Sequence, residues 1–252
     1  GLGWGAVHAD IGQSDWGIDH VWATDYDAMT CETYRRNLCP DRMDSVICQD
    51  VRELDMSSLP DINALAFGFP CNDFSTVGEQ KGFAGTYGPL YTYGAKALSL
   101  FQPDWFLAEN VSGLQSANDG AALGRILSEF EACGYRLYTN LYKFEQYGIP
   151  QARHRIIIIG IRSDLPVIYR VPSPALYSGR DNTCETALRD IPAWAKNQEI
   201  TRQSEKVIRR LSYIKPGENA FTANLPDDLK LNVKGATISQ IYRRLDPHKP
   251  AY

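Results

Sequence analysis

Short apolar runs alternate with helix-like segments over the first 160 residues of the chain. Strands of a parallel sheet are buried on both faces, so they read as near-continuous apolar runs, and the connecting helices cover the sheet. The runs that we predict as strands are residues 20–25, 45–48, 62–67, 104–110 and 155–162. The pattern indicates an α/β fold with a parallel sheet.

Amphipathic periodicity predicts helices over residues 90–101 and 122–130, and Gly134 follows the second as a C-terminal glycine should. Another helix is predicted after Asp27, which suits an N-cap. Beyond about residue 165 the periodicity weakens and only residues 201–214 read as a helix. We therefore expect two domains, 1–164 and 165–252.

The composition is that of a globular protein, with 44% hydrophobic and 22% charged residues among 252. No apolar stretch approaches the roughly 18 residues that span a bilayer, and the first residues lack a signal-peptide pattern, so we expect a cytoplasmic protein without membrane contact. The six cysteines include no CxxC pair. Neither a metal site nor a disulfide framework is therefore predicted.

Charge is distributed unequally along the chain. Residues 1–150 hold 9 Lys and Arg against 20 Asp and Glu, a net charge of −11, whereas residues 151–252 hold 17 against 10, a net charge of +7. A basic second half suits a polyanion such as nucleic acid. A solvated basic surface explains the charge alone equally well.

Several polar residues follow predicted strands, where ligands bind in open α/β sheets. Asp25 is a candidate to accept hydrogen bonds from a nucleoside ribose, and Asp50 a candidate to accept one from an adenine amino group. The alternatives are a helix cap, which we favour for the neighbouring Asp27, and an ordinary loop acid for Asp50. The stretch GLGWG, with Gly1 and Gly3, is a weak signal of a glycine loop that approaches a cofactor.

Cys71 follows Pro70 in a turn of small residues directly after a predicted strand. Free cysteine is usually an inert, buried side chain, but a partly exposed thiol at a strand end can become a thiolate nucleophile. The local sequence leaves the nucleophile and the structural thiol equally open.

Glu109 and Asn110 close an apolar strand, where a carboxylate is costly to bury unless it is paired or protonated. In QARHR, residues 151–155, strand alternation points Arg153 and Arg155 the same way. A thiolate, an acid and arginine donors together suit nucleophilic attack on a pyrimidine ring.

GFPCNDFS, AENV and QARHR, in this order, resemble the motifs of the DNA (cytosine-5) methyltransferases, and weaker agreement extends from Gly1 to about Ile161. The resemblance implies a Rossmann-like domain dependent on S-adenosylmethionine over residues 1–164. Residues 165–252 would be a connecting segment and the beginning of a target-recognition region. It implies cofactor contacts from Gly1, Gly3, Asp25, Asp50, Val51, Phe69 and Leu90.

The resemblance also implies a reaction. Cys71 would add to carbon 6 of a flipped-out cytosine in double-stranded DNA, Glu109 would contact ring nitrogen N3, and Arg155 would hold the carbonyl oxygen. Carbon 5 would then accept the methyl group. Arg153 is assigned to the same catalytic set, and the predicted substrate contacts are Pro70, Ser75, Asn110 and Gln151.

Asp73 departs from the family pattern, because an acid so near the nucleophile opposes a thiolate unless it points away. The family's first strand and closing motifs are missing from the sequence, so we expect an N- and C-terminally truncated chain with weak or no activity alone. A restriction endonuclease acting on the same DNA site is a candidate partner.

Two other functions compete with this one. A relative that acts on tRNA cytosine would share most of these motifs, although the basic segment from residue 165 favours a DNA target-recognition region. A methyltransferase-like binding protein without catalysis would have no need of Cys71, Glu109 and Arg155 together. The plainest alternative is a soluble α/β domain with a structural thiol.

Overall fold

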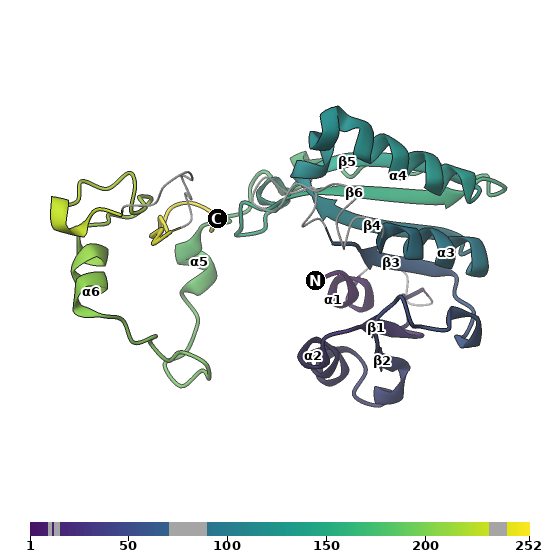
Figure 1. Ribbon diagram of the computed structural model, residues 1–252, viewed down its shortest axis with the longest axis horizontal. Coiled ribbons are helices and arrows are strands. Elements are labelled where there is room, and N and C mark those ends of the chain that lie inside the picture. The colour runs from purple at the N-terminus through teal and green to yellow at the C-terminus, as the bar shows by residue number, and fades with distance from the viewer. Residues whose placement is uncertain (10–11, 13–15, 71–89, 232–240) are drawn as a thin grey trace. The chain divides into compact units, whose positions relative to one another are not determined.

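The computed structural model describes residues 1–252 except 10–11, 13–15, 71–89 and 232–240. The chain forms two compact units (Figure 1). Unit 1 comprises Gly1–Tyr142 and Arg155–Val171, and unit 2 comprises Lys143–His154 and Pro172–Tyr252. These limits differ from the predicted boundary at 164/165, because residues 143–154 group with the second half of the chain. The assignment of functional domains to the two parts stays a prediction.

Six strands form two sheets within the part of the chain that the structure describes. The strands are β1 (Ala23–Asp25), β2 (Val46–Cys48), β3 (Ala64–Gly68), β4 (Trp105–Val111), β5 (Tyr135–Lys143) and β6 (His154–Arg162). A two-stranded sheet pairs β1 with β2 in parallel, and a four-stranded sheet has the order β3-β4-β6-β5. In the second sheet β3 and β4 are parallel, whereas β4 and β6 are antiparallel.

The expectation of a parallel sheet is therefore wrong for β6. Six consecutive residues of this strand are buried, as its β-branched run predicted. A strand that is buried on both faces carries the same apolar signal whichever way its neighbours run. The direction of β6 consequently depends on the chain path through β5, which sequence analysis did not identify.

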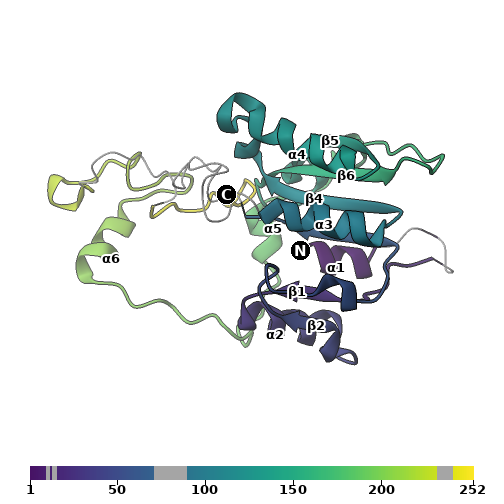
Figure 2. The same cartoon turned by 45° about the vertical axis from the view of Figure 1, so that its right-hand side comes forward.

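The described residues of unit 1 form four α-helices: α1 (Leu2–Val7), α2 (Ala28–Leu38), α3 (Tyr91–Phe101) and α4 (Ala121–Ala132). Helices α3 and α4 lie side by side on one face of the four-stranded sheet (Figure 2), and the Tyr91 hydroxyl donates to Glu129 Oε1 across them at 2.6 Å. Gly134 follows α4 with φ +96°, which confirms the predicted C-terminal glycine.

The first residues form α1, with Gly1 as its N-cap, and not the expected glycine loop. A Cβ atom at Gly3 would lie 2.8 Å from the hydroxyl oxygen of Tyr34 and 3.0 Å from Leu38. Gly3 thus allows α1 to approach α2 closely. A glycine-rich segment is a poor helix former by propensity, so only this packing reveals the helix.

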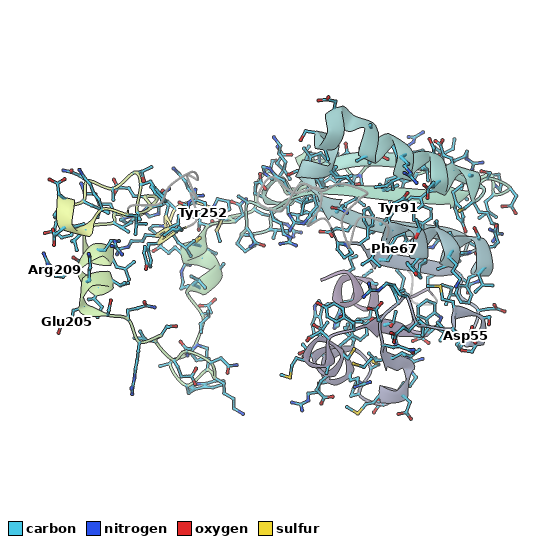
Figure 3. All side chains as sticks on the ribbon, viewed as in Figure 1. Asp55, Phe67, Tyr91, Glu205, Arg209 and Tyr252 are labelled. Carbon is cyan, nitrogen blue, oxygen red and sulfur yellow. The ribbon has the colours of Figure 1, made fainter. Side chains whose placement is uncertain are left out.

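The core of unit 1 is aromatic and lies between the four-stranded sheet and helices α3 and α4. Phe106 and Phe130 are fully buried and meet edge to face with their ring centroids 5.4 Å apart. Phe67, labelled with Tyr91 in Figure 3, contacts both rings. Burial of one such side chain contributes about 1.5–3 kcal/mol. This core holds the ends of β3 and β4 in place.

Outside residues 232–240, unit 2 contains two short α-helices, α5 (Cys184–Leu188) and α6 (Glu205–Ser212), the latter within the predicted helix 201–214. Ser204 caps α6 by accepting from Val207 N at 3.4 Å. A small apolar cluster follows the helix, formed by Ile214, Ala220, Leu225 and Leu229. Over the described ranges of both units, no helix is long and apolar enough to cross a membrane.

Candidate functional site

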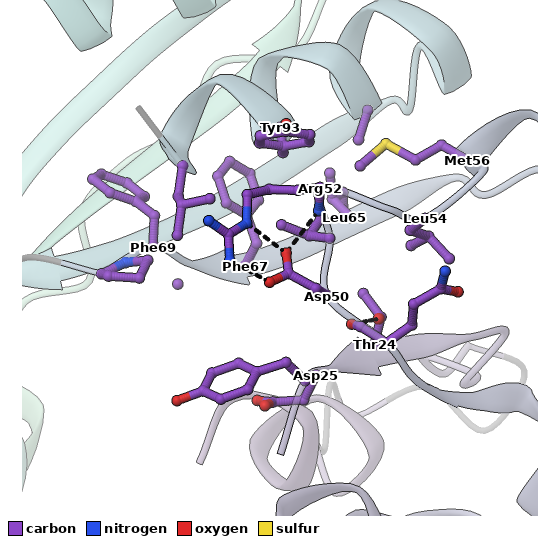
Figure 4. A pocket seen from close by; sticks show the side chains of 18 of the residues that line it. Thr24, Asp25, Asp50, Arg52, Leu54, Met56, Leu65, Phe67, Phe69 and Tyr93 are labelled. Atoms are coloured by element: carbon purple, nitrogen blue, oxygen red, sulfur yellow. Dashed lines mark hydrogen bonds and ion pairs between the residues drawn. The ribbon is translucent and has the colours of Figure 1, made fainter. Parts of the chain in front are cut away.

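A cavity of about 350 Å³ lies in unit 1 at the ends of β1, β2 and β3 (Figure 4). Its volume is that of a small-molecule pocket, and strand ends are where such pockets form in open α/β sheets. The residues that line it are Trp22, Thr24, Asp25, Tyr26, Gln49, Asp50, Val51, Arg52, Leu54, Met56, Leu65, Phe67, Gly68, Phe69, Pro70, Leu90, Tyr93, Gly94 and Ala97.

Most of the predicted cofactor residues meet in this cavity, although they come from separate parts of the sequence. Asp25 and Asp50 end or follow β1 and β2, Phe69 follows β3, and Leu90 precedes α3. Val51 and the predicted substrate residue Pro70 also line it. Neither Gly1 nor Gly3 is among the described lining residues, and their cofactor contact stays a prediction.

Asp25 and Asp27 have different environments, as the sequence suggested. Asp27 caps α2, accepting from Thr30 N at 2.7 Å, and the hydrogen bonds of Thr30 hold the pKa of its carboxyl below the usual value. Asp25 Oδ1 accepts from Asp27 N at 2.9 Å, and its side chain faces the cavity (Figure 4). The cap at Asp27 is confirmed, and Asp25 is the carboxylate of this pair that lines the cavity.

Asp50 is held by a residue that the sequence analysis did not single out. Arg52 Nε donates to Asp50 Oδ1 at 2.9 Å and Arg52 Nη2 donates to Oδ2 at 2.6 Å, with the Arg52 backbone N–H adding a third bond at 2.9 Å. The side-chain hydrogen bonds, followed by the backbone one, lower the pKa of Asp50 to about 2. Asp50 is therefore ionised at neutral pH.

Aromatic side chains form part of the cavity wall. Phe67, Phe69 and Tyr93 line it, and the Phe69 ring lies 6.2 Å from that of the buried Tyr91. Helix α3 packs closely against Phe67 at Gly94, where a Cβ would overlap the Phe67 ring. A cavity lined by aromatic rings and two carboxylates suits a flat heterocycle that carries N–H or hydroxyl donors.

Glu109 and Arg155 form an ion pair beside the cavity. Arg155 lies opposite Val111 in the antiparallel β4–β6 pairing, so it is the diagonal neighbour of Glu109 on one face of the sheet. Arg155 Nε donates to Glu109 Oε1 at 2.6 Å, and the side chains are 18% and 25% exposed. Burial at this level costs a carboxylate little once an arginine is paired with it.

Gly68 connects this ion pair to the cavity. It lines the cavity and pairs with Glu109 in the β3–β4 register, and a Cβ placed there would lie 3.5 Å from Glu109 Oε2. The buried Asn110 donates from Nδ2 to Phe69 O at 3.2 Å. The acid, the amide and the cavity wall are thus held together at the ends of β3 and β4.

None of the remaining predicted residues is among the described residues of unit 1. Gln151 and Arg153 are exposed and belong to unit 2, where Gln151 bridges to Ala251. Strand β6 begins at His154, one residue before the predicted start, so Arg153 precedes the strand that carries Arg155, and the predicted common direction of the two side chains stays a prediction. Cys71 and Ser75 lie outside the described residues. Within the described ranges no group of three potential metal ligands occurs.

Sequence reasoning missed Arg52 and, beyond Leu90 on the α3 side of the cavity, Tyr93. A signal existed in both cases, because Arg52 stands two residues after Asp50, and Tyr93 lies one helical turn after Leu90. Closeness in the sequence does not by itself show that the Arg52 side chain turns back onto Asp50. The conformation of the loop after β2 brings the Arg52 guanidinium onto the Asp50 carboxylate.

Comparison with known proteins gives one consistent result. The family model described as C-5 cytosine-specific DNA methylase matches residues 3–247. Type II methyltransferase M.BbvI of Brevibacillus brevis is 51% identical over 263 aligned positions, covering 100% of this chain and 70% of the relative. Type II methyltransferase M.NgoFVII of Neisseria gonorrhoeae is 36% identical over 250, covering 96% and 65%.

A solved structure shares the fold. It is a prophage-encoded E. coli protein described as a DNA modification methyltransferase, with a TM-score of 0.58 at 18% identity over 92% of this chain and 75% of that one. At this identity the likeness concerns the fold alone, and it confirms the predicted Rossmann-like α/β fold. The chain spans about two thirds of the length of the two relatives.

Proposed function

Because this chain belongs to the C-5 cytosine-specific DNA methylase family, we propose that it transfers a methyl group from S-adenosylmethionine to carbon 5 of cytosine in DNA. The family membership confirms the resemblance carried by GFPCNDFS, AENV and QARHR. The observation that carries the proposal is the ion pair between Glu109 Oε1 and Arg155 Nε, which lie 2.6 Å apart. Glu109 is paired in the sheet with Gly68, and Gly68 lines the same cavity as the carboxylates of Asp25 and Asp50.

The cavity supports the choice of cofactor by its chemistry. Asp25 can accept hydrogen bonds from ribose hydroxyls, Asp50 from an adenine amino group, and the aromatic wall provides apolar surface for the purine. When bound, S-adenosylmethionine supplies an electrophilic methyl group. The Val51 backbone and Leu90 complete the proposed adenosine site, and Gly1 and Gly3 are proposed to border it.

Glu109 and Arg155 are proposed to hold the target base. Arg155 has further N–H donors besides Nε, so it can donate to the carbonyl oxygen of cytosine while it remains paired with Glu109. Glu109 contacts N3 and assists its protonation, which draws electron density from carbon 6. Asn110 keeps the Phe69 backbone, and with it the segment leading to Cys71, next to the strand that carries Glu109.

Cys71 is the proposed nucleophile. Its thiolate forms a bond to carbon 6, which raises the electron density of carbon 5 and allows that carbon to accept the methyl group. Removal of the carbon 5 proton and expulsion of the thiolate then restore the aromatic ring. A base inside a duplex is out of reach, so the cytosine must be flipped out, with Pro70, Ser75, Gln151 and Arg153 as proposed contacts.

Two further roles belong to the proposal. Because the relatives are type II methyltransferases by name, we place this protein beside a restriction endonuclease that acts on the same site. We also propose a cytoplasmic location, where its DNA substrate is found.

Covalent trapping tests the mechanism. A duplex that carries 5-fluorocytosine cannot lose a proton from carbon 5, so the proposed nucleophile stays attached to the base. Because each adduct persists once it has formed, trapping also detects very slow turnover. With S-adenosylmethionine present, we expect a denaturation-resistant adduct for the wild-type chain and for Cys48→Ala, a matched exposed thiol, but none for Cys71→Ala. Adduct formation with Cys71→Ala would contradict the nucleophile. Adduct formation with single-stranded RNA in place of duplex DNA would contradict the substrate.

A further inference from the structure

Asp50 and Arg52 form a bidentate ion pair. Both carboxylate oxygens accept from the guanidinium, at 2.9 and 2.6 Å, and the backbone N–H of Arg52 binds one of them as well. In Figure 4 the Arg52 side chain lies between Tyr93 and Asp50. Three hydrogen bonds from one residue fix both the position and the plane of the carboxylate.

This pair lies in the cavity, and it is solvent-exposed. The side chains of Arg52 and Asp50 are 49% and 28% exposed, and both residues line the cavity. An ion pair in such a position contributes little to the stability of a fold. Its consequence is local, because it decides how the Asp50 carboxylate presents its remaining lone pairs to a ligand.

We propose that Arg52 is a positioning residue for adenine recognition: it orients Asp50 so that this carboxylate selects a 6-amino purine over a 6-oxo purine. This inference rests on the proposed function, which assigns the cavity to S-adenosylmethionine. A carboxylate has about four lone-pair sites, and the fork of Arg52 together with its backbone N–H takes three. The site that remains accepts one N–H of the exocyclic amino group.

The selectivity follows from the charge of Asp50 and from its fixed orientation. An aspartate is ionised at neutral pH and is then an acceptor only, and the hydrogen bonds of Arg52, which also lower its pKa to about 2, hold the carboxylate in one plane. A 6-oxo group has no N–H to donate and would place its own lone pairs against the carboxylate. Without Arg52 the carboxylate can rotate, and the penalty against the 6-oxo group falls.

Calorimetric titration with S-adenosylhomocysteine and its 6-oxo counterpart S-inosylhomocysteine tests this inference. Relative to the wild-type chain, Arg52→Gln should bind S-adenosylhomocysteine about tenfold more weakly, which is the scale of one charge-assisted hydrogen bond. The ratio of the affinity for S-adenosylhomocysteine to the affinity for S-inosylhomocysteine should fall at the same time. Arg52→Lys retains a cation but not the fork, so it should recover only part of the loss.

A double-mutant cycle separates positioning from direct contact. If Arg52 acts through Asp50, Arg52→Gln should have no further effect in an Asp50→Asn background. The matched control is Arg36→Gln on α2, which breaks another exposed arginine–carboxylate pair, Arg36 Nε to Glu32 Oε1 at 2.6 Å. It should leave both affinities unchanged. Thermal unfolding of each variant checks that the fold is retained.

The outcomes distinguish this inference from the proposed function. If wild-type protein binds neither compound, the cofactor assignment fails and the role of Arg52 fails with it. If wild-type protein binds S-adenosylhomocysteine but Arg52→Gln binds both compounds as the wild type does, the cofactor assignment stands and the inference is overturned. Additive losses in the double mutant also overturn it, because Arg52 would then act independently of Asp50.

Discussion

Glu109 and Arg155 show how two ordinary residues acquire a special environment. They are 46 positions apart in the chain, and the antiparallel register of β4 and β6 makes them diagonal neighbours. Their 2.6 Å contact leaves both side chains partly exposed. The pair can therefore reach a ligand and is still held by two strands of the core.

Glu109→Gln tests the proposed acid at nearly constant shape. The amide cannot assist protonation of N3, so we expect methyl transfer in single-turnover assays to fall at least about 100-fold. Affinity for S-adenosylhomocysteine should stay within about twofold, because Glu109 is not among the described residues that line the cavity. Glu131→Gln, an exposed position on α4, is the control. An equal fall in the rate of methyl transfer in Glu109→Gln and Glu131→Gln would refute a catalytic role for Glu109.

At the level of elements, helix α3 forms part of the cavity wall through its close approach to β3. Gly94 lies within the helix, where glycine normally costs stability, and its missing side chain makes room for Phe67. Gly124 lies within α4, and a Cβ placed there would meet no described atom within 4 Å apart from its chain neighbours and the adjacent backbone of its own helix. The two glycines differ in packing alone.

Gly94→Ala and Gly124→Ala should therefore have opposite effects. Overpacking against Phe67 should lower the free energy of unfolding by about 1–3 kcal/mol, and the displaced ring should weaken binding of S-adenosylhomocysteine. Gly124→Ala should raise the free energy of unfolding by about 0.5–1 kcal/mol. Chemical denaturation measures both. Stabilisation by both substitutions would show that α3 can move away from β3 at little cost.

For the molecule as a whole, the main feature is the separation of charge. Residues 1–150 have a net charge of −11 and residues 151–252 a net charge of +7. The basic part includes α6, where Glu205 and Arg209 are labelled in Figure 3. Phosphate groups are the obvious counter-charge for such a segment in a DNA methylase.

Binding to duplex DNA should accordingly weaken steeply with salt. Each phosphate contact adds about 0.9 to the slope of log affinity against log salt. We expect the double variant Arg202→Gln, Lys206→Gln, at two exposed positions of unit 2, to lower that slope by up to about 2. Arg36→Gln in the acidic half should not change it. An unchanged slope in the double variant would place the DNA contacts elsewhere.

The sequence by itself determined the positions of most strands, the cap at Asp27 and the family of the protein. These features depend on local chemistry, because apolar runs, cap residues and short motifs act over a few neighbouring positions. It also identified Asp25, Asp50, Phe69 and Leu90 before their meeting in one cavity was known. Their common feature is a place at the end of a strand or the start of a helix.

Only the tertiary structure decided the antiparallel direction of β6, the helical form of residues 2–7, and the partners of Asp50 and Glu109. An apolar strand carries no signal of its direction, and a glycine-rich helix exists only because another helix accepts its close approach. Ion pairs in turn depend on strand register and loop path. These are contacts between distant parts of the chain, which local patterns do not encode.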